Sequence, residues 1–268
     1  MIFSLPASAA PERVVAISGA VTEIVYALNA EDRLVGSDTT SYYPPEAETL
    51  PKVGYMRTLS AEGILSLAPD LVILTTEAGP SAAIAQLRQA GTELLIVQDD
   101  HRIEGVIQKI ERISQALDIP ARGAALAADL LRQTEALRTA VAASPARPRV
   151  MFILQYSGGA PMVAGLDTAA DGIIRLSGAD NVVTEYSAYK TFTPEAAIAA
   201  APDILLLTTQ GLEQAGGREA VLDMPGLALT PAGKNRRIIA LDSLLMLGFG
   251  PRTVAAAWQL FQAYHEHE

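Results

Sequence analysis

One stretch of this sequence is present twice, and the duplication constrains the fold more than any other feature. Residues 59–76 read LSAEGILSLAPDLVILTT, and residues 192–209 read FTPEAAIAAAPDILLLTT. Each copy opens with a helix-capping residue, Ser60 or Thr193, and continues through an apolar helical stretch to Pro-Asp and a buried-strand pattern. Two copies of helix, Pro-Asp and strand indicate a duplicated α/β unit, and therefore two similar lobes.

The segments around the two copies also correspond. Runs that read as strands, and helical patterns between and after them, recur in the same order. The matching pairs are RVVAIS and RVMFILQ, VTEIVYALNA and TAADGIIRLSGA, RLVGSD and NVVTE, ELLIVQ and RIIALD, and closing helices near 103–117 and 252–264. Strands that alternate with helices predict mainly parallel sheets covered by helices on both faces. We therefore expect an α/β fold with two Rossmann-like lobes.

Residues 120–143 lie between the two units and predict one long helix. The segment begins with Pro120, is followed by Ser144-Pro145, and is rich in Ala, Leu, Arg and Gln, which are strong helix formers. At about 1.5 Å per residue such a helix would be roughly 36 Å long, enough to run along both lobes. The expected domains are an N-terminal lobe (1–117), a linker helix (118–145) and a C-terminal lobe (146–268). A ligand cleft is expected between the lobes, at the carboxyl ends of the strands.

Composition argues against several classes of function. With 20 Lys and Arg against 30 Asp and Glu the net charge is −10, which disfavours nucleic acid as a partner. The chain has no Cys, and two of its three histidines, His265 and His267, lie in the terminal tail, so neither a thiolate site nor a multi-histidine metal site is expected. No Walker A, G-x-G-x-x-G or G-x-S-x-G motif is present, and no acid–base pair has a catalytic spacing. These absences favour a binding protein over an enzyme.

The opening residues bear on export. No apolar run is long enough to cross a bilayer. The segment MIFSLPASAA is too short for a complete signal peptide, although ASAA fits the end of one. We read the chain as a mature protein whose export signal has been removed, and the lack of Cys fits the periplasm and the cytosol alike.

Three motifs carry a resemblance to a known family. LPKVGYMRTLSAEGILSLAPDLVI, GGAPMVAGLDTAADGIIRLSGADNVV and LGFGPR together resemble the haem-specific branch of the periplasmic binding proteins. The wider class also carries cobalamin and ferric siderophores to ABC importers. The resemblance runs through both lobes and the linker, and the GY-x-R turn and GG-x-PMVAG mark the haem branch. It implies a non-catalytic, monomeric periplasmic protein that delivers ferric haem to a permease dimer in the inner membrane.

By this resemblance Tyr55 of the GYMR turn is the axial ligand of the haem iron. A phenolate is a hard anionic oxygen donor that prefers Fe(III), and tyrosinate ligation of haem is known. A tyrosine phenol is almost fully protonated at neutral pH, so ionisation needs the iron and is helped by a nearby cation. Arg57, two residues further on, is the expected cation.

Other residues are expected to contact the porphyrin. Tyr156 stands where family members often have His, and it could face the iron, stack on the porphyrin or ligate a second haem, which leaves open whether one or two haems bind. Arg252 could pair with a propionate, since Arg suits a carboxylate bidentately. The remaining expected haem contacts are Thr40, Ser41, Tyr43 and Met56.

Glu62 and Glu195 occupy matching positions in the two repeats. The family resemblance implies that one Glu on each lobe docks against arginines of a two-fold permease, and a duplicated protein can present similar contacts to a symmetric dimer. An acid in the first turn of a helix also offsets the helix dipole, so each carboxylate could serve both purposes.

Two other functions compete with haem delivery. The same fold could carry a siderophore or cobalamin, whose clefts need no axial tyrosine. An enzyme or metallocluster scaffold on paired Rossmann-like lobes would require cysteines, histidines or a phosphate loop, and the sequence offers almost none.

Overall fold

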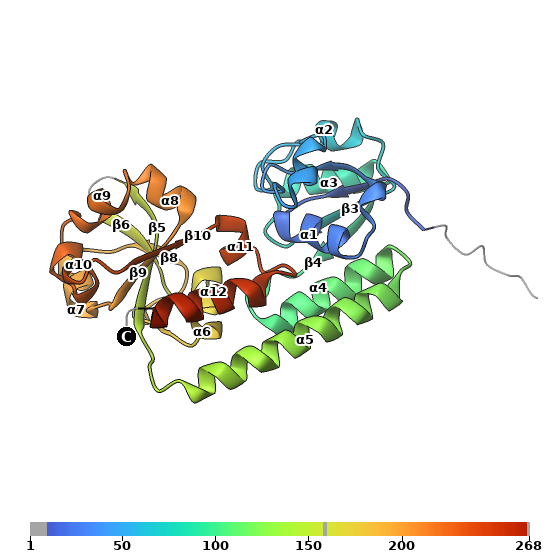
Figure 1. The fold of residues 1–268 in the computed structure, drawn as a ribbon. Helices are drawn as coiled ribbons and strands as arrows, with labels where there is room; N and C mark the ends of the chain where they lie inside the picture. The colour runs from blue at the N-terminus through green and yellow to red at the C-terminus, as the bar shows by residue number, and fades with distance from the viewer. Residues whose placement is uncertain (1–9, 158–159, 267–268) are drawn as a thin grey trace, which may run out of the picture. The chain divides into compact units, whose positions relative to one another are not determined.

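The computed structural model describes residues 10–157 and 160–266 (Figure 1). Most of MIFSLPASAA, and with it the expected remnant of a signal peptide, lies outside the described residues, as does His267. The chain divides into two compact units. The N-terminal lobe runs to Asp100 and includes Glu104–Asp129, and the C-terminal lobe comprises His101–Ile103 and everything from Leu130 on. The division falls inside α5 (Pro120–Ala143), the long helix that the sequence predicts over the same residues.

A parallel sheet forms the centre of the N-terminal lobe, with strand order β2-β1-β3-β4. Its strands are β1 (Val14–Ala16), β2 (Leu34–Ser37), β3 (Leu71–Thr75) and β4 (Glu93–Val97). Its helices are α1 (Gly19–Ala27), η1 (Glu31–Arg33), η2 (Pro45–Thr49), α2 (Ala61–Leu65), α3 (Ser81–Gln89) and α4 (Ile103–Ala116). Every residue of β1 and β3 is buried, as expected for strands covered on both faces. All carboxyl ends of these strands lie at one edge of the sheet.

The C-terminal lobe has a mixed sheet, with strand order β10-β9-β5-β6-β8 and β7 paired to β5. Its strands are β5 (Arg149–Ser157), β6 (Ala160–Ala164), β7 (Asp180–Asn181), β8 (Tyr189–Thr191), β9 (Ile204–Thr208) and β10 (Ile238–Leu241). Its helices are α6 (Ala169–Leu176), α7 (Pro194–Ala200), α8 (Thr209–Gln214), α9 (Arg218–Leu222), η3 (Leu227–Leu229), α10 (Pro231–Lys234), α11 (Ser243–Leu247) and α12 (Thr253–His265). The pairs β5–β6 and β6–β8 are antiparallel, and the other pairs are parallel. The α/β class and the mainly parallel sheets are therefore confirmed, with an antiparallel extension that the sequence analysis does not predict.

The expected strand NVVTE forms only at its first residue. β7 ends at Asn181, whose side-chain oxygen accepts a hydrogen bond from the backbone of Val183 at 3.1 Å. This local turn takes the chain out of the sheet after two residues.

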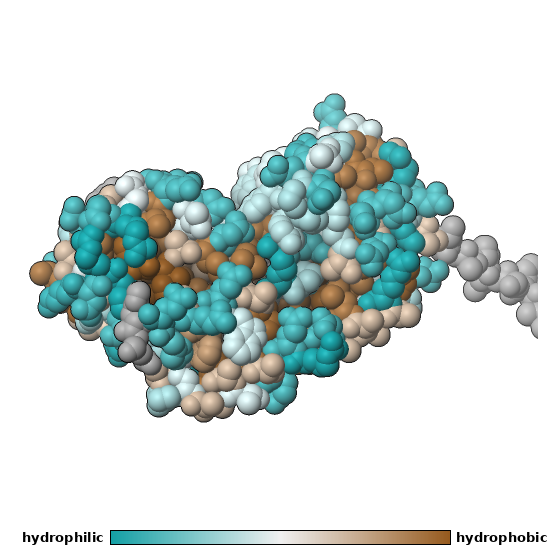
Figure 2. All heavy atoms as spheres, viewed as in Figure 1, coloured by the Kyte–Doolittle hydropathy of each residue, from teal (hydrophilic) through white to brown (hydrophobic). Residues whose placement is uncertain are grey.

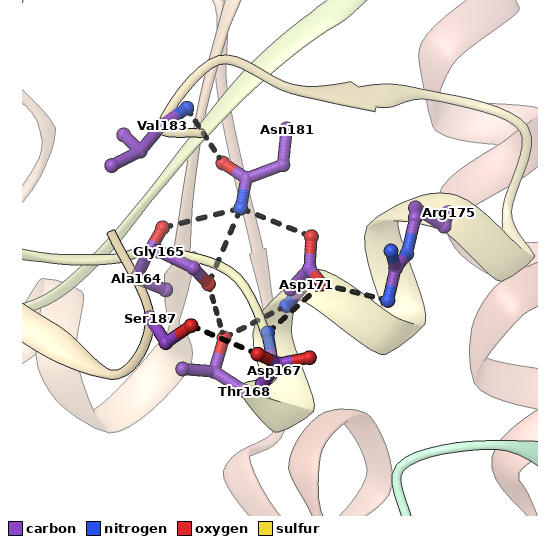
Figure 3. Close-up of polar contacts among 9 residues, drawn as sticks. All are labelled: Ala164, Gly165, Asp167, Thr168, Asp171, Arg175, Asn181, Val183 and Ser187. Atoms are coloured by element: carbon purple, nitrogen blue, oxygen red, sulfur yellow. Dashed lines mark hydrogen bonds and ion pairs between the residues drawn. The ribbon is translucent and has the colours of Figure 1, made fainter. Parts of the chain in front are cut away.

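Asn181 also belongs to a buried polar network that shapes the loop between β6 and α6 (Figure 3). Its amide nitrogen donates to Asp171 Oδ1 at 3.2 Å and to the carbonyl of Ala164 at 3.2 Å. Asp171 is fully buried and also pairs with Arg175, at 2.8 Å. Thr168 caps α6 by accepting from the backbone of Asp171 at 3.1 Å. The motif AGLDTAADG therefore forms a fixed loop, because each of these polar groups has a partner.

The repeated Pro-Asp has the same structural role in both lobes. Asp70 accepts a hydrogen bond from the backbone of Arg13 at 3.0 Å, and Asp203 accepts one from the backbone of Arg149, also at 3.0 Å. The guanidinium of Arg13 donates to the carbonyl of Leu67 at 2.6 Å, and that of Arg149 donates to the carbonyl of Ala200 at 2.6 Å. Each pair therefore fastens the end of a helix to the start of the first strand.

Most of the molecular face seen in Figure 2 carries polar side chains, with apolar residues in smaller patches. In the described part of the chain, no helix combines the length and the apolar content that a membrane span requires.

Candidate functional site

The carboxyl ends of β1 and β2 meet at Asp38, which is fully buried. Its carboxylate accepts hydrogen bonds from the backbone of Ser18 at 2.9 Å, from the hydroxyl of Thr40 at 2.8 Å and from the hydroxyl of Ser41 at 2.8 Å. Thr40 in turn accepts a bond from the backbone of Gly19 at 2.9 Å. These bonds hold Ser18 at φ 99°, a conformation that residues other than glycine rarely adopt. Thr40 and Ser41 were expected to contact a ligand. In the structure their hydroxyls instead bond to Asp38 and stabilise the loop after β2.

Lys52 ties the same loop to its neighbours. Its ammonium donates to Ser37 Oγ at 2.9 Å, to the carbonyl of Ser41 at 2.7 Å and to the carbonyl of Ala47 at 2.8 Å. Burial lowers the pKa of Lys52, while the carboxylates of Asp38 and Glu48 oppose the shift. Asp38 therefore stabilises the start of the loop between β2 and the GYMR turn, and Lys52 stabilises its end.

The GYMR turn exposes the phenol that the sequence analysis singled out. Gly54 has φ +99°, and the backbone of Thr58 donates to the carbonyl of Tyr55 at 2.8 Å to close a tight turn. The side chain of Met56 points into the lobe, 9% exposed, whereas Tyr55 is 44% exposed. The turn therefore buries the thioether of Met56 in the lobe and leaves the phenol of Tyr55 half exposed.

Backbone bonds fasten this turn to the loop between β3 and α3. The amide of Leu59 donates to the carbonyl of Gly79 at 2.8 Å, and the amide of Gly79 donates to the carbonyl of Met56 at 2.9 Å. The turn therefore rests on the segment that follows the first copy of the repeat.

Side chains reinforce the same contact. Arg57 forms an ion pair with Glu77, and its guanidinium lies close enough to the phenol of Tyr55 to interact with it electrostatically. Burial of the guanidinium acts to lower the pKa of Arg57, but Glu77 and Tyr55 together raise this pKa above its ordinary value. Arg57 therefore remains a cation beside the phenol of Tyr55.

The other expected haem contacts lie in different surroundings. Tyr43 is 39% exposed, on the same lobe as Tyr55, whereas Ser41 is fully buried. Tyr156 lies in β5 opposite Pro161 of β6, and its side chain lies outside the described part of the structure. Arg252 is half-buried at the start of α12, where its carbonyl accepts a bond from Ala256 at 3.0 Å. The structure thus brings together Tyr55 and Arg57 in one lobe, and it places Tyr156 and Arg252 in the other.

Glu62 and Glu195 are exposed in the first turns of α2 and α7. Ser60 caps α2 by accepting from the amide of Gly63 at 3.3 Å. Thr193 caps α7 in the same way, accepting from the amide of Ala196 at 3.2 Å. The two carboxylates therefore stand on equivalent helix starts.

Three residues of this region were not identified from the sequence. Asp38 and Glu77 each follow a parallel strand, where ligand-site residues gather, so their positions could have marked them. Lys109 interrupts the apolar face of α4, which is also visible in the sequence. Within the described residues no group of three or more His, Cys, Asp or Glu is placed to hold a metal ion.

The sequence matches the family described as periplasmic binding protein over residues 14–245. The chain belongs to this family. Such proteins are the substrate-binding components of ABC importers and act outside the cytoplasm, with a transporter permease as partner. Family members and structural neighbours bind and transport their ligands.

Two solved structures resemble this periplasmic binding protein over nearly its whole length. The periplasmic heme-binding protein BhuT in complex with two hemes is 46% identical, with a TM-score of 0.91 and coverage of 94% of this chain and 97% of that chain. The periplasmic heme-binding protein RhuT from Roseiflexus sp. RS-1 in apo form is 44% identical, with a TM-score of 0.92 and coverage of 95% and 98%. A sequence relative, the vitamin B12-binding protein of Vibrio vulnificus (strain CMCP6), is 29% identical over 98% of this chain and 94% of its own length.

Proposed function

We propose that this protein binds ferric haem through the phenolate of Tyr55 and delivers it to the permease dimer of an ABC importer. One observation carries the proposal. The exposed phenol of Tyr55 lies beside the guanidinium of Arg57, and Arg57 is itself anchored by Glu77. The haem is cargo, so the site must hold the iron firmly and still release it.

The chemistry of this arrangement suits ferric iron. A bound ferric iron would favour loss of the phenol proton, because opposite charge stabilises the ionised form. The anionic oxygen prefers Fe(III) to Fe(II). In this proposal Arg57 donates to the phenolate oxygen in the haem complex, an outer contact that orients the ligand.

The remaining expected contacts have distinct roles in this proposal. Tyr43 contacts the porphyrin near Tyr55, and Arg252 pairs with a propionate. Met56, expected as a porphyrin contact, packs in the core of the lobe and supports the Tyr55 turn instead. Thr40 and Ser41 maintain the loop through Asp38. Tyr156 either stacks on the porphyrin or supplies a second phenol, to the same iron or to the iron of a second haem.

The resemblances support haem as the ligand. The two heme-binding structures are 44–46% identical to this chain, compared with 29% for the vitamin B12-binding relative. Glu62 and Glu195 stand on equivalent helix starts, as docking to a two-fold permease requires. A single protein monomer in the periplasm presents both carboxylates to the permease.

A hemin titration tests the proposal. Wild-type protein should develop the absorption spectrum of tyrosinate-ligated ferric haem, and Tyr55→Phe should lose the tyrosinate band and bind hemin at least tenfold more weakly. Tyr26→Phe is the matched control, because it removes a phenol from α1 of the same lobe. Absence of any spectral change with hemin would reject the proposal.

Cobalamin is the second candidate ligand, favoured by the vitamin B12-binding relative. Calorimetric titration with cyanocobalamin distinguishes the two. Heat of binding from cyanocobalamin that survives Tyr55→Phe, together with no response to hemin, would favour the cobalamin carrier.

A further inference from the structure

The second copy of the repeated segment exposes an apolar side chain that the first copy packs away. Ile198 lies three residues after Glu195 in α7, and residues three apart share one face of a helix. Ile198 is 40% exposed. Its counterpart is Leu65, which lies three residues after Glu62 and packs against the hydrophobic core of the N-terminal lobe. Of the two copies, the second therefore leaves more apolar surface beside its carboxylate.

The connection between β9 and β10 extends this apolar surface. The matching connection between β3 and β4, residues 76–92, contains α3, whereas residues 209–237 contain α8, α9, η3 and α10. In this longer connection η3 packs against α7. The approach is so close that a Cβ on Gly226 would clash with the backbone of Pro194, the first residue of α7. Leu229, the last residue of η3, is 57% exposed.

The two segments that meet here contain a single charge. Residues 193–202 read TPEAAIAAAP and residues 224–233 read MPGLALTPAG, so Glu195 is their one charged residue. Their exposed apolar residues are Ile198, Ala199, Pro225, Ala228 and Leu229. Isolated exposed apolar side chains are ordinary, whereas apolar side chains gathered on neighbouring elements mark a protein interaction surface. Scarcity of charge among apolar side chains is typical of the core of such an interface.

The position of Glu195 indicates what covers this surface. The chain belongs to a family whose partner is a transporter permease, and Glu195 is the carboxylate that α7 offers to the permease in the proposed function. A permease subunit that reaches Glu195 in the first turn of α7 comes over Ile198 on the same helix face. It also borders η3, because η3 packs against α7.

We propose that Ile198 and Leu229 form an apolar contact with the permease subunit that engages Glu195. The matching permease surface would carry apolar side chains beside a cation. The N-terminal lobe docks mainly through Glu62, so the two halves of a symmetric permease meet unequal surfaces. The inference rests on the proposed function for its partner, and it requires no haem.

Stimulation of the transporter ATPase by the haem-free protein tests the contact. The importer is held in lipid nanodiscs, and the binding-protein concentration for half-maximal stimulation is measured. Ile198→Ser with Leu229→Ser should raise this concentration about tenfold, because less apolar area leaves water on docking. Leu131→Ser is the matched control, since Leu131 is 51% exposed on α5, and it should change the concentration by less than about twofold.

Salt dependence separates the apolar contact from the ionic one. Raising NaCl from about 50 mM to about 500 mM should weaken docking of the wild type, because ions screen the contacts of Glu62 and Glu195. Ile198→Ser with Leu229→Ser should keep the wild-type salt dependence at lower affinity. Glu195→Ala should instead reduce the salt dependence, because an ionic contact is lost.

Wild-type half-maximal stimulation by the Ile198→Ser, Leu229→Ser variant would overturn the inference, as would an equal loss in Leu131→Ser. Sedimentation showing that the wild type dimerises and the double variant does not, with stimulation unchanged, would assign the surface to a second copy of this chain. If the double variant does not fold, Ile198→Ala with Leu229→Ala is judged by the same titration.

Failure of the proposed function gives different results. Unchanged stimulation by Glu195→Ala, together with weaker docking of the Ile198→Ser, Leu229→Ser variant, would contradict the docking role of Glu195 and support the apolar contact. If the wild-type protein does not respond to hemin, haem is not its ligand, and titration of the haem-free protein still decides the inference.

Discussion

The two lobes share a scaffold but differ in the residue that follows the repeated segment. In the N-terminal lobe this residue is Glu77, which pairs with Arg57. In the C-terminal lobe it is Gln210, whose amide nitrogen donates to Asp242 at 3.0 Å and whose oxygen accepts from the amide of Ser243 at 3.1 Å. The same strand end therefore carries an ion pair in one lobe and a neutral amide in the other.

The strand that leads to this residue also ends differently in each lobe. Thr208 ends β9 and caps α8 by accepting from the amide of Gly211 at 2.8 Å. Its counterpart Thr75 ends β3 without a capping role, and the chain turns through a loop to Gly79, which holds the Tyr55 turn. The two lobes therefore share their buried strands, whereas the residues that follow β3 and β9 have different partners.

The largest expected effect concerns a feature that the lobes share. Glu62→Ala with Glu195→Ala should leave hemin binding intact and abolish stimulation of the transporter ATPase, because both docking carboxylates are lost. Each single variant should retain part of the stimulation. The matched control is Glu111→Ala with Glu135→Ala, which removes two exposed carboxylates from α4 and α5. Full stimulation of the transporter ATPase by the Glu62→Ala, Glu195→Ala variant would show that these two carboxylates are not needed for docking to the permease.

A reciprocal exchange at the strand ends should have the next largest effect. Glu77→Gln gives the N-terminal lobe the residue of the C-terminal lobe, and it should weaken hemin binding about tenfold since Arg57 loses its anchor. Gln210→Glu should change hemin affinity by less than about twofold but destabilise its lobe, because it brings a carboxylate towards Asp242. Equal losses of hemin affinity from the two variants would contradict the division of roles.

The smallest effect is expected at the repeated Pro-Asp. Asp70 accepts from two backbone amides, those of Glu12 and Arg13, whereas Asp203 accepts from Arg149. Chemical denaturation should therefore show a loss of about 2 kcal/mol for Asp70→Ala and about 1 kcal/mol for Asp203→Ala. Asn at either position keeps an acceptor oxygen and should cost less. A larger loss of unfolding free energy for Asp203→Ala than for Asp70→Ala would contradict the link between stability and the number of amides that each carboxylate accepts from.

Much of the fold could be read from the sequence because the repeat and the apolar strands are local signals. The range of α5 follows from its composition and its flanking prolines. The antiparallel pairing of β5 with β6 was not foreseen, since a glycine-rich stretch after a strand indicates a loop as readily as a hairpin. The early end of β7 depends on the side-chain bonds of Asn181, which involve distant carbonyls.

The candidate site could be predicted only in part, because some of its residues are neighbours in the sequence and others are brought together by the fold. Tyr55 and Arg57 are close in sequence, so one motif contains both. Glu77 reaches Arg57 through the fold, and no spacing in the sequence connects them. Lys109 could have been noticed in the sequence, because its charge interrupts the apolar pattern of α4. Its partner Asp99 could not, because it lies outside that helix.

A crystal structure of the protein grown with ferric haem would test the central claim most directly. Our account predicts a bond between the haem iron and the phenolate oxygen of Tyr55, with Arg57 in contact with the same oxygen. Iron bound by a different side chain, with Tyr55 turned towards solvent, would contradict it.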